Sequence, residues 1–265
     1  MSATVAKEGP VVVKLGGSVI TDKSSEGVFK PDTVTRLLRE ISSFRSRLIL
    51  VHGGGGFAHP AAKRYRVSEG APASNPWAAS YTANMMVRLN QEVCARMLEE
   101  GMAPFSIPPR AVLDLQGNLS PSFFSLMGFA LSAGFTPITY GDVYLVREKA
   151  FAIISGDLLA AELALRLKAS MLVYATGADG VYLNYPPHKG ERPLPVVDRS
   201  TRFQSNASDA TGGMSYKVEQ ALRAASQGCE CLILNANSPG RLAAALERGQ
   251  VECTRVVWNS SGQSF

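Results

Sequence analysis

The sequence predicts an α/β protein with a mainly parallel central sheet, and three observations support this fold class. Short apolar runs alternate with longer amphipathic runs along most of the 265 residues. Such alternation is typical of parallel strands joined by crossover helices. Two glycine-rich turns each follow a strand-like run. Apolar residues make up 46% of the chain and charged residues 18%, a balance that indicates a folded domain and excludes general disorder.

The expected elements follow from the spacing of the apolar residues. Strands are expected where short apolar runs occur, at residues 11–13, 48–51, 103–107, 136–140, 172–175 and 231–234. Helices are expected where apolar residues recur every three or four positions, at residues 31–44, 77–98, 158–167, 215–225 and 241–248. Prolines from Pro186 to Pro195 indicate a loop-rich stretch at about 184–207. Without a visible linker or internal repeat, these elements predict one compact unit with two lobes.

The charge of the chain says little about its partner. The formal net charge is +5, but lysine and arginine are dispersed along the sequence and form no basic block. We therefore expect no nucleic-acid partner. An anionic small substrate and an ordinary solvated basic surface both account for the excess of positive charge.

The cysteine spacing and the length of the apolar runs indicate the cellular location of the protein. Cys94, Cys229, Cys231 and Cys253 lack metal-binding spacing, so reduced thiols are expected. Cys229 and Cys231 alternate along a strand-like run, which favours core packing over metal binding. No apolar run reaches membrane-spanning length, and the first ten residues carry no leader signature. The expectation is a cytoplasmic protein with no membrane partner.

The first glycine-rich turn, at residues 14–18 (KLGGS), follows the strand at 11–13. Glycine lets backbone N–H groups approach a phosphate closely, and Lys14 can reach the same anion. A plain turn, whose glycines only permit unusual backbone angles, explains the run equally well. The Walker spacing is absent, which excludes a P-loop protein.

The second turn, at residues 52–59 (HGGGGFAH), follows the strand at 48–51. Gly53, Gly55 and Ala58 match the dinucleotide-binding fingerprint, which would indicate a nicotinamide-dependent oxidoreductase. The acidic residue that should follow about 20 residues later to hold a ribose has no good candidate. His59, beside a helix start, can instead donate a hydrogen bond to a phosphate. Together the two turns predict a protein built around two anions.

Three later segments add polar candidates. Asp157, directly before an expected helix, is either an N-cap or a carboxylate that orients lysines around a phosphoryl group. Lys217 lies one turn into the helix at 215–225 and supplies a second cation behind a further glycine turn. The run 176–182 (TGADGVY) follows a strand at its carboxyl end, where open α/β sheets bind ligands; a plain turn is the alternative.

The long helix expected at 77–98 carries an apolar residue at every fourth position from Trp77 to Met97. Most such stripes pack against the core. Methionine and aromatic side chains also form adaptable pocket walls, so Tyr81, Met85 and Met86 are candidates for an apolar substrate wall.

Five ordered motifs carry a resemblance to a known family. They are residues 14–23 (KLGGSVITDK), 52–60 (HGGGGFAHP), 140–143 (YGDV), 154–157 (ISGD) and 209–214 (DATGGM). With these runs in this order, nearly the whole chain resembles the amino acid kinase superfamily and, within it, the isopentenyl phosphate kinases. The resemblance implies a three-layer open αβα sandwich, a homodimer, and ATP-dependent phosphorylation of isopentenyl phosphate in isoprenoid biosynthesis with Mg²⁺. Fosfomycin kinase, whose loop is similar, is the alternative, but it needs a small polar pocket.

The resemblance also implies roles for individual residues. An N-terminal lobe, about 1–168, would bind the isoprenoid monophosphate and a C-terminal lobe, about 169–265, would bind ATP. Lys14 and Lys217 would neutralise the transferring phosphoryl group, with Asp157 orienting both lysines. Lys23 would assist at the transition state, and His59 would hydrogen-bond the acceptor phosphate.

Glycines and nucleotide contacts complete the implied site, which contains no protein metal ligand. The residues implied to cradle acceptor phosphate and phosphoryl group are Gly54, Gly55 and Gly156. The residues implied on the ATP side are Lys14, Gly16, Gly17, Ser18, Gly55, Thr176, Asp179, Tyr182, Gly212, Gly213 and Lys217.

Three positions depart from the family pattern. Ala58 replaces the usual glycine before the histidine, which should stiffen that loop. Gly177 stands where an aspartate is common, which bears on one nucleotide contact. Leu158 replaces a frequent second aspartate, which bears on the magnesium shell.

Overall fold

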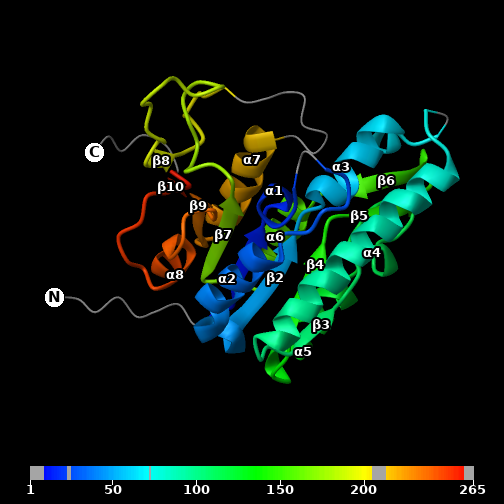
Figure 1. Ribbon diagram of the computed structural model, residues 1–265, viewed down its shortest axis with the longest axis horizontal. Helices are drawn as coiled ribbons and strands as arrows, with labels where there is room; N and C mark the ends of the chain where they lie inside the picture. The colour runs from blue at the N-terminus through cyan, green and yellow to red at the C-terminus, as the bar shows by residue number, and fades with distance from the viewer. Residues whose placement is uncertain (1–8, 23–24, 72, 205–212, 260–265) are drawn as a thin grey trace.

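The computed structural model describes the chain except residues 1–8, 23–24, 72, 205–212 and 260–265. Its centre is an eight-stranded sheet in the order β3-β4-β2-β1-β7-β9-β10-β8. The strands pair in parallel except β9 with β10, which pair antiparallel. Helices cover the sheet on both sides (Figure 1), so the predicted three-layer α/β sandwich is confirmed.

The elements have the following bounds. The strands of the large sheet are β1 (Val11–Leu15), β2 (Leu48–His52), β3 (Pro104–Ser106), β4 (Thr136–Tyr140), β7 (Met171–Thr176), β8 (Val196–Val197), β9 (Glu230–Asn235) and β10 (Thr254–Val256). A separate antiparallel hairpin consists of β5 (Asp142–Val146) and β6 (Ala150–Ile154). The α-helices are α1 (Gly17–Ile20), α2 (Pro31–Ile41), α3 (Gly55–Arg64), α4 (Pro76–Glu99), α5 (Pro121–Ser132), α6 (Gly156–Arg166), α7 (Gly213–Ala225) and α8 (Arg241–Leu246). Short 3₁₀ turns are η1 (Ser42–Arg47), η2 (Val67–Glu69) and η3 (Pro109–Ala111).

Most predicted elements are confirmed, with small changes at their ends. The helix expected at 31–44 ends as an α-helix at Ile41 and continues as the 3₁₀ turn η1. The predicted loop at 184–207 contains the two-residue strand β8. The helix α5 and the hairpin β5–β6 were not predicted. Because α5 is apolar at most of its positions, its sequence shows no distinct stripe.

Alternate side chains of the central strands enter two different cores. In β1, Val11 and Val13 pack into the core below α2, α4 and α8, whereas Val12 packs into the core below α5, α6 and α7. A strand that is buried on both faces needs apolar residues at successive positions, as residues 11–13 have. Burial on both faces also explains why the central strands could be predicted from short apolar runs in the sequence. Cys229 and Cys231 share the second of these cores, which confirms their predicted packing.

The large sheet runs without a break through the predicted lobe boundary. Residues 168 and 169 lie in the turn between α6 and β7. Strand β1 pairs with β2 on one side and with β7 on the other. The two lobes therefore share one sheet, and the assignment of acceptor and ATP to them stays a prediction.

The carboxylate of Glu40 links α2 to α8 across the predicted lobe boundary. The carboxylate of Glu40 accepts hydrogen bonds from the backbone N–H groups of Gly240, Leu242 and Ala243, at 3.0, 3.1 and 3.3 Å. Arg36 lies 2.5 Å from the same carboxylate. Glu40 thus satisfies N–H groups at the start of α8 that have no partner within that helix.

Replacing Glu40 by alanine is expected to lower the free energy of unfolding by about 2 kcal/mol, because the first turn of α8 loses its cap. Urea unfolding followed by circular dichroism measures this loss. The matched control is Glu100→Ala, which removes the exposed pair with Arg39 on the same helix α2. Equal losses of unfolding free energy in Glu40→Ala and Glu100→Ala would contradict the assigned role of Glu40 as the cap of α8.

None of the helices in the part of the chain that the structure describes combines the length and the apolar character that spanning a bilayer requires. All four cysteines lie within that part and are free thiols.

Candidate active site

The two glycine-rich turns are in direct backbone contact. A Cβ added to Gly17 would lie 2.1 Å from the backbone nitrogen of Gly55. A Cβ added to Gly55 would lie 2.3 Å from the carbonyl oxygen of Gly17, and Gly55 also has a φ of +47°. Only glycine fits at both positions. The close packing of Gly17 against Gly55 therefore holds the two glycine-rich turns next to each other.

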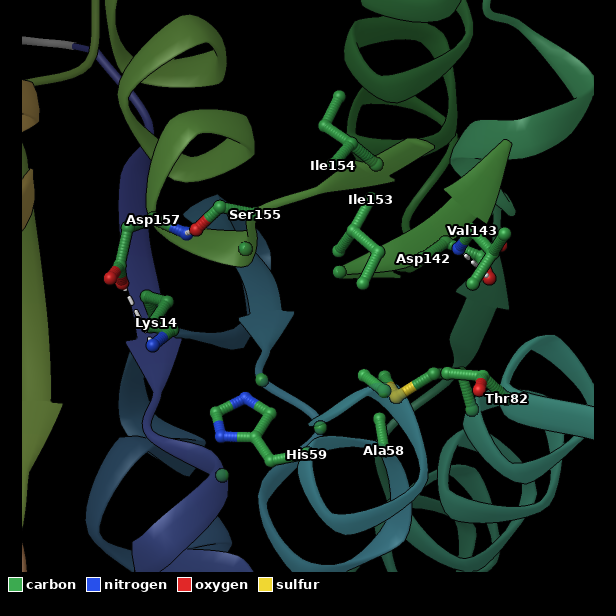
Figure 2. Close-up of a pocket in the computed structure, with 17 residues that line it drawn as sticks. Lys14, Ala58, His59, Thr82, Asp142, Val143, Ile153, Ile154, Ser155 and Asp157 are labelled. Atoms are coloured by element: carbon green, nitrogen blue, oxygen red, sulfur yellow. Dashed lines mark hydrogen bonds and ion pairs between the residues drawn. The ribbon is translucent and has the colours of Figure 1, made fainter. Parts of the chain in front are cut away.

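A carboxylate bridges two lysines beside these turns. Lys14 Nζ lies 2.8 Å from Asp157 Oδ1, and Lys217 Nζ lies 2.7 Å from Asp157 Oδ2. The three residues come from β1, α6 and α7, and all of them are buried. Figure 2 shows Lys14 and Asp157 joined at one side of the cavity. The backbone N–H of Asp157 donates to Ser155 Oγ at 3.1 Å, so Ser155 is the N-cap of α6. The N-cap interpretation of Asp157 is therefore wrong.

This cluster carries an excess of positive charge. Burial raises the pKa of Asp157, but the two ammonium groups of Lys14 and Lys217 outweigh burial and hold that pKa well below its usual value. The carboxylate is therefore ionised at neutral pH. The ring of Tyr174 lies 5.1 Å from Lys217 Nζ, and its hydroxyl donates to the carbonyl oxygen of Asp157 at 2.9 Å. Two buried ammonium groups and one carboxylate are complementary to an anion.

A cavity extends from this cluster, and its two ends differ in chemistry (Figure 2). At the polar end lie Lys14, Gly17, Gly53, Gly54, His59, Ser155, Gly156 and Asp157. At the other end lie the mostly apolar Ala58, Ala62, Thr82, Met86, Val143, Ile153 and Ile154. Gly141 and Asp142 line the wall between β4 and β5. A ligand with an anionic head and a short hydrocarbon tail matches this division.

His59 and Ala58 reach the cavity from α3. His59 is half-buried, and Figure 2 shows its imidazole on the same side of the cavity as Lys14. A Cβ added to Gly54 would lie 2.6 Å from the Cβ of Ala58, so the methyl group of Ala58 fills the space against that glycine. Ala58 lies within the first turn of α3, and the expected stiffening by its methyl group stays a prediction.

His52, the other histidine of the turn, does not face the cavity. It is fully buried, its ring stacks on Tyr140 at 5.2 Å, and its Nε2 lies 3.3 Å from Asn90 Oδ1. Burial lowers the pKa of His52 to about 4, so the ring is neutral at pH 7. His52 supports the strand end and supplies no positive charge.

Of the three predicted wall residues of α4, only Met86 lines the cavity. Tyr81 instead lies near the surface, where its hydroxyl donates to Glu26 at 3.0 Å. Met85 packs into the core close to Gly27. Successive residues of a helix point about 100° apart, so Met85 and Met86 face different surroundings. Thr82 precedes Met86 by one turn of α4 and therefore lies on the same face as Met86.

The predicted ATP-side residues that the structure describes lie at the carboxyl ends of β1, β2 and β7 and in the first turns of α7. A Cβ added to Gly177 would lie 3.7 Å from Ser18 Oγ, so the turn after β7 adjoins the turn after β1. Thr176 Oγ1 accepts the backbone N–H of Ala178 at 3.1 Å. Gly16 donates its N–H to Ala175 at 2.8 Å. Gly213 starts α7 with a φ of +59°.

Asp179 and Tyr182 contact each other and an arginine. Tyr182 donates its hydroxyl to Asp179 at 3.1 Å, and Arg241 lies 2.5 Å from the same carboxylate. The carboxylate of Asp179 is therefore paired with Arg241 and Tyr182 in this structure. Two predicted site residues, Lys23 and Gly212, lie outside the described residues. Leu158, at the position where the family often has aspartate, packs against the core below α5, α6 and α7.

Buried lysines and glycine turns form an anion site at the carboxyl ends of parallel strands. A site of this kind is typical of phosphotransferases. The chain belongs to the amino acid kinase family, whose sequence model, described as "Amino acid kinase family", matches residues 9–235.

Individual relatives narrow this assignment. The chain is 35% identical to the isopentenyl phosphate kinase of Methanothermobacter thermautotrophicus, with 93% of this chain and 98% of the relative covered. It is 31% identical to the isopentenyl phosphate kinase of Thermoplasma acidophilum, with 88% and 94% covered. An X-ray structure of isopentenyl phosphate kinase superposes with a TM-score of 0.80 at 34% identity, covering 93% of this chain and 99% of that chain.

Proposed function

We propose that this protein transfers the γ-phosphoryl group of ATP to isopentenyl phosphate, giving isopentenyl diphosphate and ADP. The observation that carries the proposal is the cavity that joins a lysine- and glycine-lined end to an apolar end. Isopentenyl phosphate has an anionic head and a short branched hydrocarbon tail, so it matches both ends. The names of the relatives that cover most of the chain support the same acceptor.

The proposed mechanism needs charge stabilisation and alignment more than covalent chemistry. The acceptor phosphate is already an anion at neutral pH, so no general base is required. Lys14 and Lys217 would neutralise the charge on the phosphoryl group in flight, while Asp157 holds both ammonium groups in place. Gly17 and Gly54 line the polar end of the cavity, where their backbone would lie beside the phosphates of donor and acceptor as these align. His59 would hydrogen-bond the acceptor phosphate.

Magnesium would enter this site together with ATP. Among the described residues, no group of three or more histidine, cysteine, aspartate or glutamate side chains gathers around one point. Nucleotide phosphates and water would supply most of the ligands of the magnesium ion, because Mg²⁺ keeps several waters and binds substrate phosphates. Bound there, Mg²⁺ would neutralise part of the phosphate charge.

The apolar wall counts against fosfomycin as the acceptor, because that molecule needs a small polar pocket. The packing of Gly55 and Gly56 counts against a nicotinamide dinucleotide. A Cβ added to Gly56 would lie 2.1 Å from the carbonyl oxygen of Asp22, so this glycine faces protein. At Gly55, a fingerprint position, Thr21 and Gly17 fill the space where a side chain would lie, so a pyrophosphate cannot occupy that space. Gly53 and Gly54, in contrast, line the cavity.

The proposal is tested by ADP release with ATP, Mg²⁺ and a panel of acceptors. The panel contains isopentenyl phosphate, dimethylallyl phosphate, fosfomycin and amino acids. Turnover of the two isoprenoid monophosphates is expected. Turnover of fosfomycin or an amino acid alone would refute the proposed acceptor.

Replacing His59 by alanine is expected to lower kcat/KM for isopentenyl phosphate by about 10- to 100-fold, since a hydrogen bond to a charged group contributes about 1.5–3 kcal/mol. The KM for ATP should change little. Steady-state kinetics with each substrate varied in turn measures both constants. His188→Ala, in the loop before β8, is the control; an unchanged kcat/KM in the His59 variant would remove this residue from the acceptor site.

We also propose a homodimer and a cytoplasmic location. Apolar side chains are exposed beside the edge strand β3, among them Phe105, Phe129 and Phe135, and Phe129 is 72% exposed. An apolar patch at a sheet edge supports association with a second copy of the chain. The four free thiols support a reducing compartment.

A further inference from the structure

The apolar end of the cavity has two walls that come from distant parts of the chain. Thr82 and Met86 come from α4, whereas Val143 and Ile153 come from the hairpin β5–β6. The two strands of this hairpin pair with each other in a sheet of their own. The large sheet fixes only the start of the hairpin, because a single residue separates β5 from β4. Apolar packing of Val143 and Phe151 against Ala79 and Ala83 joins the hairpin to α4. A directional polar contact acts beside this packing.

One guanidinium group joins the two walls. Arg110, in η3, contacts the carboxylate of Asp142 through Nε at 2.6 Å and through Nη2 at 2.6 Å. The same Nη2 donates to the backbone carbonyl of Ala83 at 2.9 Å. Ala83 follows the wall residue Thr82 in α4, and Asp142 precedes the wall residue Val143 in β5. Arg110 thus connects the two walls through Asp142, which lines the cavity, and through the backbone of Ala83, which lies next to the wall residue Thr82.

The Asp142 end of this connection is held firmly. The carboxylate is fully buried and also accepts the backbone N–H of Val143 at 2.8 Å. Burial raises the pKa of Asp142 to about 6, and Arg110 opposes that rise. Figure 2 shows Asp142 and Val143 across the cavity from Asp157 and Lys14. A two-pronged contact between arginine and carboxylate restrains both distance and orientation.

We infer that Arg110 is a positioning residue that fixes the gap between the hairpin and α4, and so limits the length of the acceptor's hydrocarbon tail. This inference rests on the proposed function, because it takes the apolar end as the site of that tail. Arg110 itself lies outside the cavity lining and acts through Asp142 and Ala83. Monophosphates of short branched alkenols fit between the restrained walls, whereas longer prenyl chains require the hairpin to move away from α4.

The test compares two acceptors in three variants. Arg110→Lys keeps the charge but loses the two-pronged contact. Arg110→Met leaves a buried carboxylate without its partner and can unfold the protein, so Arg110→Met/Asp142→Leu, which removes both charges, is the main variant. The ratio of kcat/KM for geranyl phosphate to that for isopentenyl phosphate is expected to rise at least about tenfold in the double variant, and less in Arg110→Lys. The KM for ATP should stay within about twofold of the wild-type value.

The matched control is Arg39→Met/Glu100→Gln. Arg39 also donates two hydrogen bonds to a carboxylate, that of Glu100, at 2.8 and 2.9 Å. Glu100 lies at the end of α4, and the pair does not contact the hairpin. The control should leave the acceptor ratio unchanged. An unchanged ratio in the folded Arg110→Met/Asp142→Leu variant, or an equal change in the control, would overturn the inference.

Hydrogen exchange gives a readout that does not depend on activity. Amides of residues 142–154 should exchange faster in both Arg110→Lys and the double variant, while amides of α2 should keep their wild-type rates. If the wild-type protein phosphorylates none of the isoprenoid monophosphates, the proposed function fails. The exchange rates still decide whether Arg110 holds the hairpin: wild-type rates in residues 142–154 would refute that role.

Discussion

Replacing Lys217 by methionine is expected to lower kcat by about 1000-fold, because removing one preorganised charge from a buried anion site costs about 100- to 1000-fold in rate. The KM for the acceptor should change far less, since the ammonium group of Lys217 would act on the phosphoryl group in flight. Asp157 would keep its contact with Lys14 at 2.8 Å, so the remaining cluster should stay folded and ionised.

Initial rates with saturating ATP and isopentenyl phosphate measure this effect. Lys217→Arg, which keeps the positive charge, should retain more activity than Lys217→Met. Lys63→Met, on the exposed side of α3, is the control for removing a lysine elsewhere. A kcat within a factor of about ten of the wild-type value in Lys217→Met would contradict the assigned role.

Replacing Gly55 by alanine is expected to destabilise the protein by more than about 4 kcal/mol and to abolish turnover. The added Cβ would lie 2.1 Å from Thr21 Oγ1 and 2.3 Å from the carbonyl oxygen of Gly17. Neither turn can move without opening the backbone contact that brings the anion-binding groups together.

Thermal and urea unfolding measure this loss, and the chain offers a close control. Gly101 also has a positive φ, +71°, but nothing lies within 4 Å of a Cβ added there. Gly101→Ala should therefore lose only about 1 kcal/mol from the unfavourable backbone angle. If both alanine variants lose the same stability, crowding at Gly55 is not the reason for its glycine.

The residues that make the anion site were predictable because their local sequence limits them strongly. Gly17 and Gly55 must be glycine for steric reasons, and a lysine at the end of a buried strand has few other uses. The family resemblance also implied that Asp157 orients Lys14 and Lys217, whereas the local sequence allowed an N-cap as well. What they did not give was the hydrogen-bond partner at the start of α6, where serine caps the helix and leaves the aspartate for the lysines.

The apolar end was harder to predict because it depends on which way each helix and hairpin faces. The choice between Met85 and Met86 is a choice of rotation about the axis of α4: the stripe at every fourth position contains Met85, which packs into the core, whereas Met86 lines the cavity. The hairpin β5–β6 was missed altogether, so Val143 and Ile153 were unknown as wall residues. The contact of Arg110 with Asp142 joins segments whose approach is set by tertiary packing alone.

The central position of β1 has a consequence for how the chain folds during synthesis. Val11 pairs with Leu48 on one side and with Met171 on the other, and every residue of β1 is buried. While the second half of the chain is still being made, β1 is an apolar edge strand without its neighbour, the kind of edge that invites pairing with other chains. Completion of β7 closes that edge. Lys14 lies on this strand and Lys217 follows β7 in the sequence, so the cluster of Lys14, Asp157 and Lys217 should form only after this late step of folding.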